Sequence, residues 1–444
     1  MQRDNVIVAA GVGVKPSSEA SVSRLQAWTL FLMTFLLMLS DYATRQCIAP
    51  MFPLIKADWL LTDNQLGMLV SIVTVAVGVT TIPIALLADR WGRVKSITLM
   101  AFIWCLATVF CGIAKSYEQM FAARFLVGLG EGAYAAGASA LLAHAFPVEK
   151  RAAVMGASQS AGLFGSVLGI ALAGVLAPKF GWHMTFIVIG APGLLIAALF
   201  PFLVRDYKTV KLAYNNKEGE RATTRKRFMQ IVREIFATRS GNFVYLGFGV
   251  QMAMPVIIVA WLTTYLNRYF GMDLKKAAGM TALTVLFGAI GMASGGSIAD
   301  RVRRKKPRAR IVIPAVYTAI TGISLFAAFA LPPSPLALVL IIVGALFSTA
   351  HVGPSVATAL DVTHPAVRAT VTGTLVTIGN LLGQSMGPFL VGLMSDKIGL
   401  KAALTIIPAI TIISTLCLIL ASRTYLADMA KYKTEEPSDE KAKH

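Results

Sequence analysis

The sequence contains a ten-residue stretch, LLADRWGRVK at 86–95, that returns in altered form as SIADRVRRKK at 297–306. Both stretches place Ala-Asp-Arg at the end of a long apolar run, and Asp89 and Asp300 lie 211 positions apart. Two further pairs repeat at similar spacings: KRAAVMG with VRATVTG, 217 positions apart, and GVLAPKFG with GLMSDKIG, 218 positions apart. Repeats at similar spacings predict a chain built from two similar halves.

The composition places both halves in a membrane. Of the 444 residues, 56% are hydrophobic and only 14% are charged, whereas soluble domains carry about 25% charged residues. These values exclude an ordinary soluble or disordered protein, and the apolar runs lack the strict alternation of membrane β-strands. Each run can cross a bilayer as a helix. We therefore predict an all-α membrane protein of twelve helices in two six-helix bundles, with spans at 26–49, 64–87, 95–114, 119–145, 152–176, 183–204, 242–267, 277–299, 311–331, 335–360, 369–394 and 401–422.

The distribution of basic residues predicts the orientation. With both termini inside, the inner segments hold 31 Lys and Arg and the outer loops hold 8, which follows the positive-inside rule. The net charge of +19 then reflects topology, and we expect no nucleic-acid partner. We predict an inner-membrane protein with this domain order: a cytoplasmic tail at 1–25, bundles at 26–204 and 242–423, a basic linker at 205–241 and a second cytoplasmic tail at 424–444.

The loop after the second span resembles the best-known motif of the major facilitator superfamily, Asp-Arg-x-Gly-Arg, here Asp89, Arg90, Gly92 and Arg93. Two stretches resemble the Spinster-like branch of that superfamily: YATRQCIAPMFPLIKADWLLTDNQLG at 42–67 and RFLVGLGEGAYAAG at 124–137. The resemblance implies a major facilitator fold that works by alternating access. It also implies gating roles for the loop motif and for its weaker second copy, Asp300 and Arg301.

Four ionisable residues lie within the spans, where charge is costly and usually functional. Asp41 and Arg45 share one helix face at i,i+4, and Arg124 and Glu131 share another at i,i+7. We expect Glu131 and Asp41 to carry protons, and Arg124 and Arg45 to hold an anionic substrate, since guanidinium matches carboxylate in bidentate fashion. Depth along each helix suggests that Asp41 pairs with Arg45 or Arg124, and that Glu131 has no cation at its level. The alternative is a static ion pair that joins two helices.

Other candidate substrate contacts are neutral. Tyr134 lies in the fourth span, Gln251 and Trp261 in the seventh, and Asn380 and Gln384 at i,i+4 in the eleventh. Each side chain can hydrogen-bond a substrate in a central cavity. Each can equally bond a neighbouring helix, so the pattern leaves both interpretations open.

The function predicted from these features is secondary active transport. There is no GxxxxGK[ST] nucleotide loop, no HExxH or GxSxG motif, and no metal spacing among the four cysteines, so we expect neither an enzyme nor a cofactor or metal. The leading hypothesis is proton-coupled symport of a small organic anion by a monomer in the lipid bilayer. The alternatives are transport of an amphipathic lipid such as a lysophospholipid or sphingoid, a drug:proton antiporter and a non-transporting membrane sensor. We expect an arginine-lined cavity for the anion and a wide apolar one for the lipid.

Overall fold

The structure is a computed structural model, and it describes residues 23–132, 134–204, 233–304, 306, 308–364 and 367–433. Most of the predicted tails (1–22 and 434–444) and of the predicted linker lie outside these residues, whereas residues 424–433, predicted as tail, continue the last helix. Every regular element within the described ranges is helical. The elements are α1 (Arg24–Gln46), α2 (Ile48–Trp59), α3 (Asp63–Trp91), α4 (Arg93–Ile113), α5 (Tyr117–Glu131), α6 (Tyr134–Ala145), α7 (Val148–Leu203), α9 (Arg239–Gln251), α10 (Ala253–Phe270), α11 (Leu274–Arg303), α12 (Ala309–Ala330), α13 (Pro335–Ala350), α14 (Val352–Asp361), α15 (Arg368–Ile378), the π-helix η2 (Gly379–Gln384), α16 (Met386–Ile398), α17 (Leu400–Ile406), the 3-10 helix η3 (Ile407–Ala409) and α18 (Ile410–Lys433).

The helices make twelve crossings. Within the described ranges, nine segments are long and apolar enough to span a membrane on their own. One of them, Ala153–Leu203, covers two crossings because Gly181 breaks α7 with a φ of 78°. The remaining two crossings are each divided into shorter helices, α5 with α6 and α15 with α16. The chain therefore has the predicted all-α, twelve-helix membrane fold.

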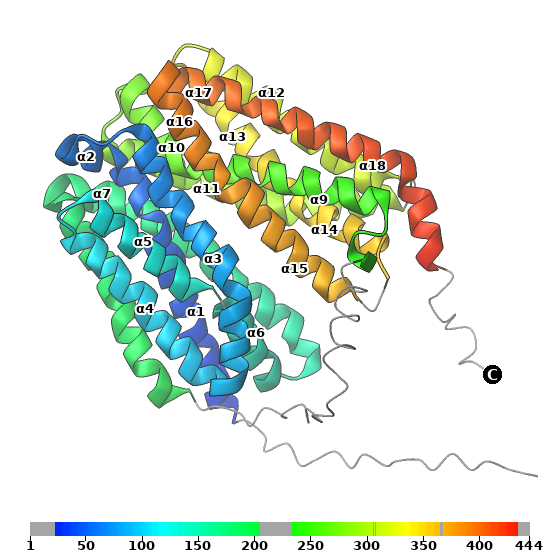
Figure 1. Cartoon of the computed structure of the whole chain (residues 1–444), viewed down its shortest axis with the longest axis horizontal. Helices are drawn as coiled ribbons and strands as arrows, with labels where there is room; N and C mark the ends of the chain where they lie inside the picture. The colour runs from blue at the N-terminus through cyan, green and yellow to red at the C-terminus, as the bar shows by residue number, and fades with distance from the viewer. Residues whose placement is uncertain are drawn as a thin grey trace, which may run out of the picture.

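The crossings form two bundles that meet along a limited surface (Figure 1). Helices α1 to α7 pack on one another in the first bundle, and α9 to α18 do so in the second. Contacts between the bundles join α2 to α10, α3 to α16 and α7 to α11. The helix ends divide into two sets. We call the end with Arg24, Leu203, Arg239 and Lys433 the linker end, and the end with Trp59, Tyr117 and Phe270 the loop end.

Glycine marks equivalent turns in the two halves. Gly181 and Gly399 end the matched stretches GVLAPKFG and GLMSDKIG, and both have positive φ, 78° and 82°. A side chain is strained in this region of φ. The repeat seen in the sequence therefore corresponds to a repeated backbone turn at the loop end.

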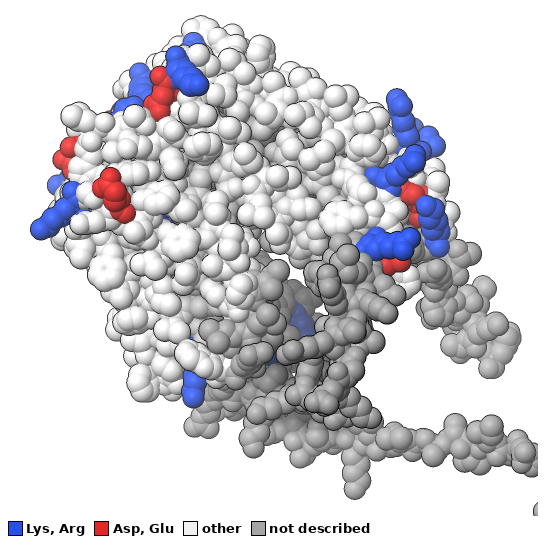
Figure 2. Space-filling view, viewed as in Figure 1, with Lys and Arg blue, Asp and Glu red and all other residues white. Residues whose placement is uncertain are grey.

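The apolar core is shared between bundles on the loop-end side. One buried cluster contains residues from both bundles, and Phe52 of α2 packs against Trp261 of α10 with ring centroids 5.3 Å apart. Two other large clusters lie within single bundles. Figure 2 shows charged side chains at the two ends of the molecule and an uncharged surface between them, as a membrane-spanning protein requires.

Candidate substrate and proton site

An ion pair between α1 and α5 occupies the middle of the first bundle. Arg45 Nη1 lies 3.3 Å from Glu131 Oε2, and Arg45 Nη2 donates to Thr74 Oγ1 at 3.1 Å. The Glu131 side chain is 4% exposed and the Arg45 side chain 19%. The glutamate is therefore buried, while its guanidinium partner retains access to open space.

This pairing differs from the one expected from depth along each helix. The first span does not stop at residue 49: α1 continues almost directly into α2 and ends at Trp59. Fourteen positions separate Arg45 from Trp59, and fourteen also separate Glu131 from Tyr117, where α5 begins. At about 1.5 Å per residue, both side chains lie about 21 Å from the loop end. The longer first span thus brings Arg45 to the level of Glu131.

Asp41 lies one helical turn from Arg45 and beside Glu131. Its side chain interacts with the Glu131 carboxyl group, and it is 6% exposed. Its Oδ1 atom and Glu131 Oε1 have no hydrogen-bond partner among the described residues. Two buried carboxyl groups thus lie close together, and only Glu131 is ion-paired with the guanidinium, an arrangement that can hold a proton between the acids.

Arg124 has a different environment from Arg45. It is completely buried, and it donates from Nε to the Leu69 carbonyl at 3.1 Å and from Nη2 to the Arg45 carbonyl at 3.2 Å. Tyr134 is also buried and donates to the Thr34 carbonyl at 2.6 Å. Neither side chain lines the cavity that lies between the two bundles. These contacts join helices of the first bundle to one another.

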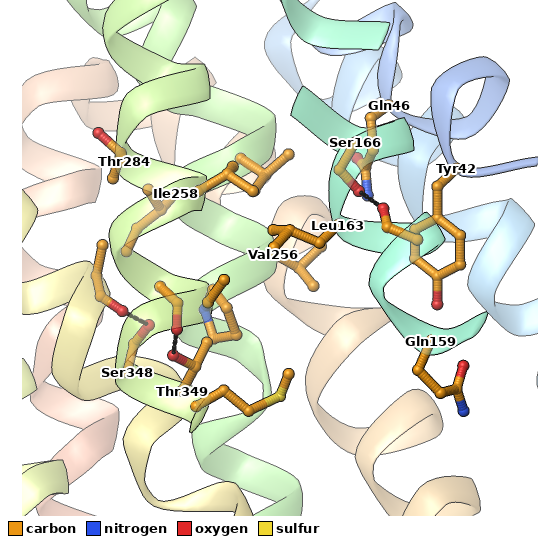
Figure 3. A pocket seen from close by; sticks show the side chains of 18 of the residues that line it. Tyr42, Gln46, Gln159, Leu163, Ser166, Val256, Ile258, Thr284, Ser348 and Thr349 are labelled. Atoms are coloured by element: carbon orange, nitrogen blue, oxygen red, sulfur yellow. Dashed lines mark hydrogen bonds between the residues drawn. The ribbon is translucent and has the colours of Figure 1, made fainter. Parts of the chain in front are cut away.

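A cavity of about 770 Å³ lies between the two bundles. The first bundle lines it with α1 and α7, and the second lines it with α10, α11, α13 and η2. Figure 3 shows Tyr42 and Gln159 on one side of this space and Val256 and Thr349 on the other. Tyr42 and Gln46, which flank Arg45 on the same helix, line the cavity. No Lys, Arg, Asp or Glu is among its described lining residues. The arginine-lined cavity expected for an anionic substrate is therefore not found among them, and Arg45 is set back from the cavity wall, next to Gln46 in the chain.

The candidate residues of the second bundle lie in different surroundings. Gln384 lines the cavity and donates to Asn380 Oδ1 at 2.7 Å. Trp261 is buried at the bundle interface and donates to the Pro388 carbonyl at 3.2 Å. Gln251 is also buried, and its amide atoms have no hydrogen-bond partner among the described residues. Only Gln384 among these four therefore lines the cavity.

Comparison with known proteins identifies the family. A sequence profile described as Major Facilitator Superfamily matches residues 30–388. This chain belongs to that superfamily. It is 25% identical to a probable L-galactonate transporter of Escherichia coli, over 97% of this chain and 100% of that protein. It is 27% identical to a probable sulfoacetate transporter of Cupriavidus necator, over 65% of this chain and 68% of that protein.

The fold is also found in a solved transporter structure. A crystal structure of a bacterial homologue of the human lysosomal transporter Spinster, in an inward-facing and occupied conformation, matches with a TM-score of 0.80. The two chains are 22% identical, and the match covers 91% of this chain and 98% of the other. The protein is thus a multi-pass membrane transporter of the Major Facilitator Superfamily.

At the loop end, a polar network that sequence analysis did not predict joins the two bundles of this transporter. Asp63 at the start of α3 accepts two bonds of 2.8 Å from Arg268 of α10, and it also bonds Lys56 at 2.5 Å and the Ser395 hydroxyl. The backbone N–H groups of Asp63 and Asn64 donate to Asp396 of α16 at 2.7 and 2.9 Å. The sequence held one indication of this network, since Asp396 lies in one of the repeated stretches. It did not indicate which residue Asp396 contacts.

The predicted gating motifs lie at the linker end. Gly92 has a φ of 102° and precedes α4, which begins with the half-buried Arg93. The side chains of Asp89 and Arg90 lie outside the described residues.

The second copy of the motif contributes one ion pair. Asp300 accepts from Arg310 Nη2 at 3.1 Å, while Arg301 is exposed and makes no ion pair among the described residues. Arg310 also pairs with Asp361 at 2.6 Å, and Tyr425 donates to the same acid at 2.7 Å. Sequence reasoning missed Asp361 because it lies one position beyond a predicted span.

Proposed function

We propose that this transporter moves a small organic anion together with protons by alternating access. The observation that carries the proposal is the Arg45–Glu131 pair, which lies beside a cavity between the bundles. The relatives named above, described as probable L-galactonate and sulfoacetate transporters, support an anionic substrate.

Coupling follows from the electrostatics of the pair. While Glu131 is ionised, it neutralises Arg45 and reduces the attraction of that guanidinium for a second anion. Protonation of Glu131 releases the positive charge of Arg45, which can then bind a substrate carboxylate in bidentate fashion. Anion binding favours proton binding by the same factor, because the coupling of two ligands is reciprocal. Asp41, beside Glu131, serves as the second proton carrier.

The predicted orientation completes the cycle. With both termini in the cytoplasm, the network at Asp63 closes the outer side, and the central cavity is accessible from the cytoplasmic side of the inner membrane. In this cycle the motifs at 89–93 and 300–301 act as gates. The segment 205–241 links the two bundles, and the transporter works as a monomer. Arg124 and Tyr134 then support the fold of the first bundle and do not contact substrate.

The first test measures the thermal shift of the purified protein at two pH values in the presence of organic acids, among them L-galactonate and sulfoacetate. We expect the ligand to bind more tightly at lower pH. In proteoliposomes, Glu131→Gln mimics the protonated acid, so it should lose accumulation driven by a pH gradient while retaining exchange of substrate across the membrane. Proton-driven accumulation equal to that of the wild type would contradict the assignment. Glu118→Gln, an exposed acid on the same helix, is the matched control and should leave accumulation unchanged.

A second candidate function is transport of an amphipathic lipid such as a lysophospholipid or sphingoid. The apolar α10 and α11 wall of the cavity favours it, because such a wall can pack against an acyl chain. A thermal shift with a lysophospholipid but with none of the acids would select this candidate. Substrate movement in liposomes should then persist after Glu131→Gln when no pH gradient is applied.

A further inference from the structure

The polar groups of the cavity are unequally available to a ligand. Five Ser and Thr residues line it, and all five hydroxyls donate to backbone carbonyls. Ser160 donates to Ala157 at 2.7 Å, Ser166 to Gly162 at 2.8 Å, Thr284 to Met280 at 2.8 Å, Ser348 to Ala345 at 2.8 Å, and Thr349 to Gly288. The Gln384 amide is likewise bonded to Asn380. These groups can still accept a bond, but the five hydroxyl donors are already occupied, and the Gln384 amide retains one free N–H.

Three polar side chains in the cavity wall are free to bond a ligand. Tyr42, Gln46 and Gln159 line the cavity, and their side chains make no hydrogen bond within the described part of the chain. All three belong to the first bundle, on α1 and α7, and two of them flank Arg45. In Figure 3 the Tyr42 hydroxyl and the Gln159 amide extend into the same space. The free donors of the cavity are thus concentrated on the wall that carries the guanidinium.

The opposite wall is mostly apolar, and its polar side chains are the already bonded Thr284, Ser348, Thr349 and Gln384. The second bundle lines the cavity with aliphatic and thioether side chains of α10 and α11, among them Pro255, Val256, Val259, Val285, Ala289 and Met292. A substrate hydroxyl placed against such a wall loses its bonds to water without replacement, which is costly. An apolar group placed there is stabilised by its removal from water.

From this asymmetry we infer the substrate class, an inference that rests on the proposed function. The substrate is a compact monocarboxylate with an apolar aryl or branched alkyl body, and not a polyhydroxylated sugar acid. Its carboxylate lies toward Tyr42, Gln46 and Gln159, within reach of the Arg45 guanidinium once Glu131 is protonated. Its body packs against α10 and α11. A volume of about 770 Å³ admits such a ligand with room to spare, since small-molecule sites span roughly 300–1,000 Å³.

The test compares two monocarboxylates that differ in their bodies. Binding of 3-phenylpropionate and of gluconate to the purified full-length protein is measured by calorimetry at the lower of the two pH values. We expect 3-phenylpropionate to bind at least about tenfold more tightly, and Tyr42→Phe and Gln159→Leu each to weaken that binding by about tenfold, as loss of a bond to a charged group does. Thr284→Val removes a hydroxyl that is already bonded to its own helix, so we expect less than a twofold effect.

The outcomes separate this inference from the proposed function. Equal or tighter binding of gluconate, with proton-driven uptake intact, overturns the substrate class and leaves the proposed function standing. A loss from Thr284→Val as large as that from Tyr42→Phe also overturns it. If neither acid binds and a lysophospholipid does, both proposals fail. Tyr42→Phe deletes a single hydroxyl, so the test remains decisive if Gln159→Leu does not fold.

Discussion

Arg45 and Arg124 lie on neighbouring helices, and their different surroundings give them different roles. Arg45 faces a carboxylate and keeps partial exposure, whereas Arg124 is fully buried against backbone carbonyls of α1 and α3. From sequence both are buried cations on membrane helices, and both were candidate anion ligands. The bonding partners of each arginine determine its role, and helix periodicity in the sequence cannot predict those partners.

We expect Arg124 to act on stability. Arg124→Met keeps most of the buried volume but leaves the Leu69 and Arg45 carbonyls without their side-chain donor, which should destabilise the protein by about 1–3 kcal/mol. The midpoint of thermal unfolding, followed by tryptophan fluorescence in detergent, measures this loss. The exposed Lys275 provides the control, since Lys275→Met should not move the midpoint. An unchanged midpoint in Arg124→Met would show that its contacts contribute nothing to stability.

At the scale of elements, the sequence predicted which segments are helical and missed where the first one ends. The predicted first span ends at residue 49, directly before Pro50. Pro50 instead lies in the first turn of α2, where proline is tolerated, and Lys56 pairs with Asp63. This shift of about ten residues changed the depth of Arg45 and hence its partner. A site built from side chains on different helices depends on such boundaries, which sequence patterns locate poorly.

The repeated turns offer a test at this scale. Gly181 has a φ of 78° and a ψ of 161°, a region that residues with a side chain adopt at a cost of about 1–3 kcal/mol. Gly181→Ala should therefore lower the unfolding midpoint in detergent. Gly279 lies inside α11 with no atom within 4 Å of the position of an added Cβ, so Gly279→Ala should leave the midpoint equal or higher. Equal midpoints for the two variants would contradict the strain at Gly181.

At the scale of the whole molecule, the bundles are held together at the loop end. The shared apolar cluster with Phe52 and Trp261 and the polar network at Asp63 both join α2 and α3 to the second bundle. Sequence identified the two halves and the pairs of repeated stretches. It could not identify the bonds between halves, because Asp63 and Arg268 lie 205 positions apart in the chain.

Breaking the network should open the loop end. Asp63→Asn removes the charge that Arg268 and Lys56 share, so we expect a longer component in the distance distribution between spin labels at Lys179 and Lys275. Both label sites are exposed, and the four native cysteines are buried. Glu118→Gln, an exposed acid on the first bundle, should leave the distribution unchanged. A distribution in Asp63→Asn identical to the wild type would argue against a closing role for this network.

The π-helix η2 accounts for a small irregularity in the repeat. Gly156 and Gly181 are 25 positions apart, while their counterparts Gly373 and Gly399 are 26 apart, and η2 lies inside the longer interval. A π turn accommodates one additional residue in a helix, and one residue corresponds to a rotation of about 100°. Because the π turn absorbs this single insertion, α16 keeps its rotational phase, and with it the face that presents Ser395 and Asp396 to α3. The second half is therefore one residue longer than the first in this interval. The extra residue lies on the helix that runs from the central cavity to the loop end.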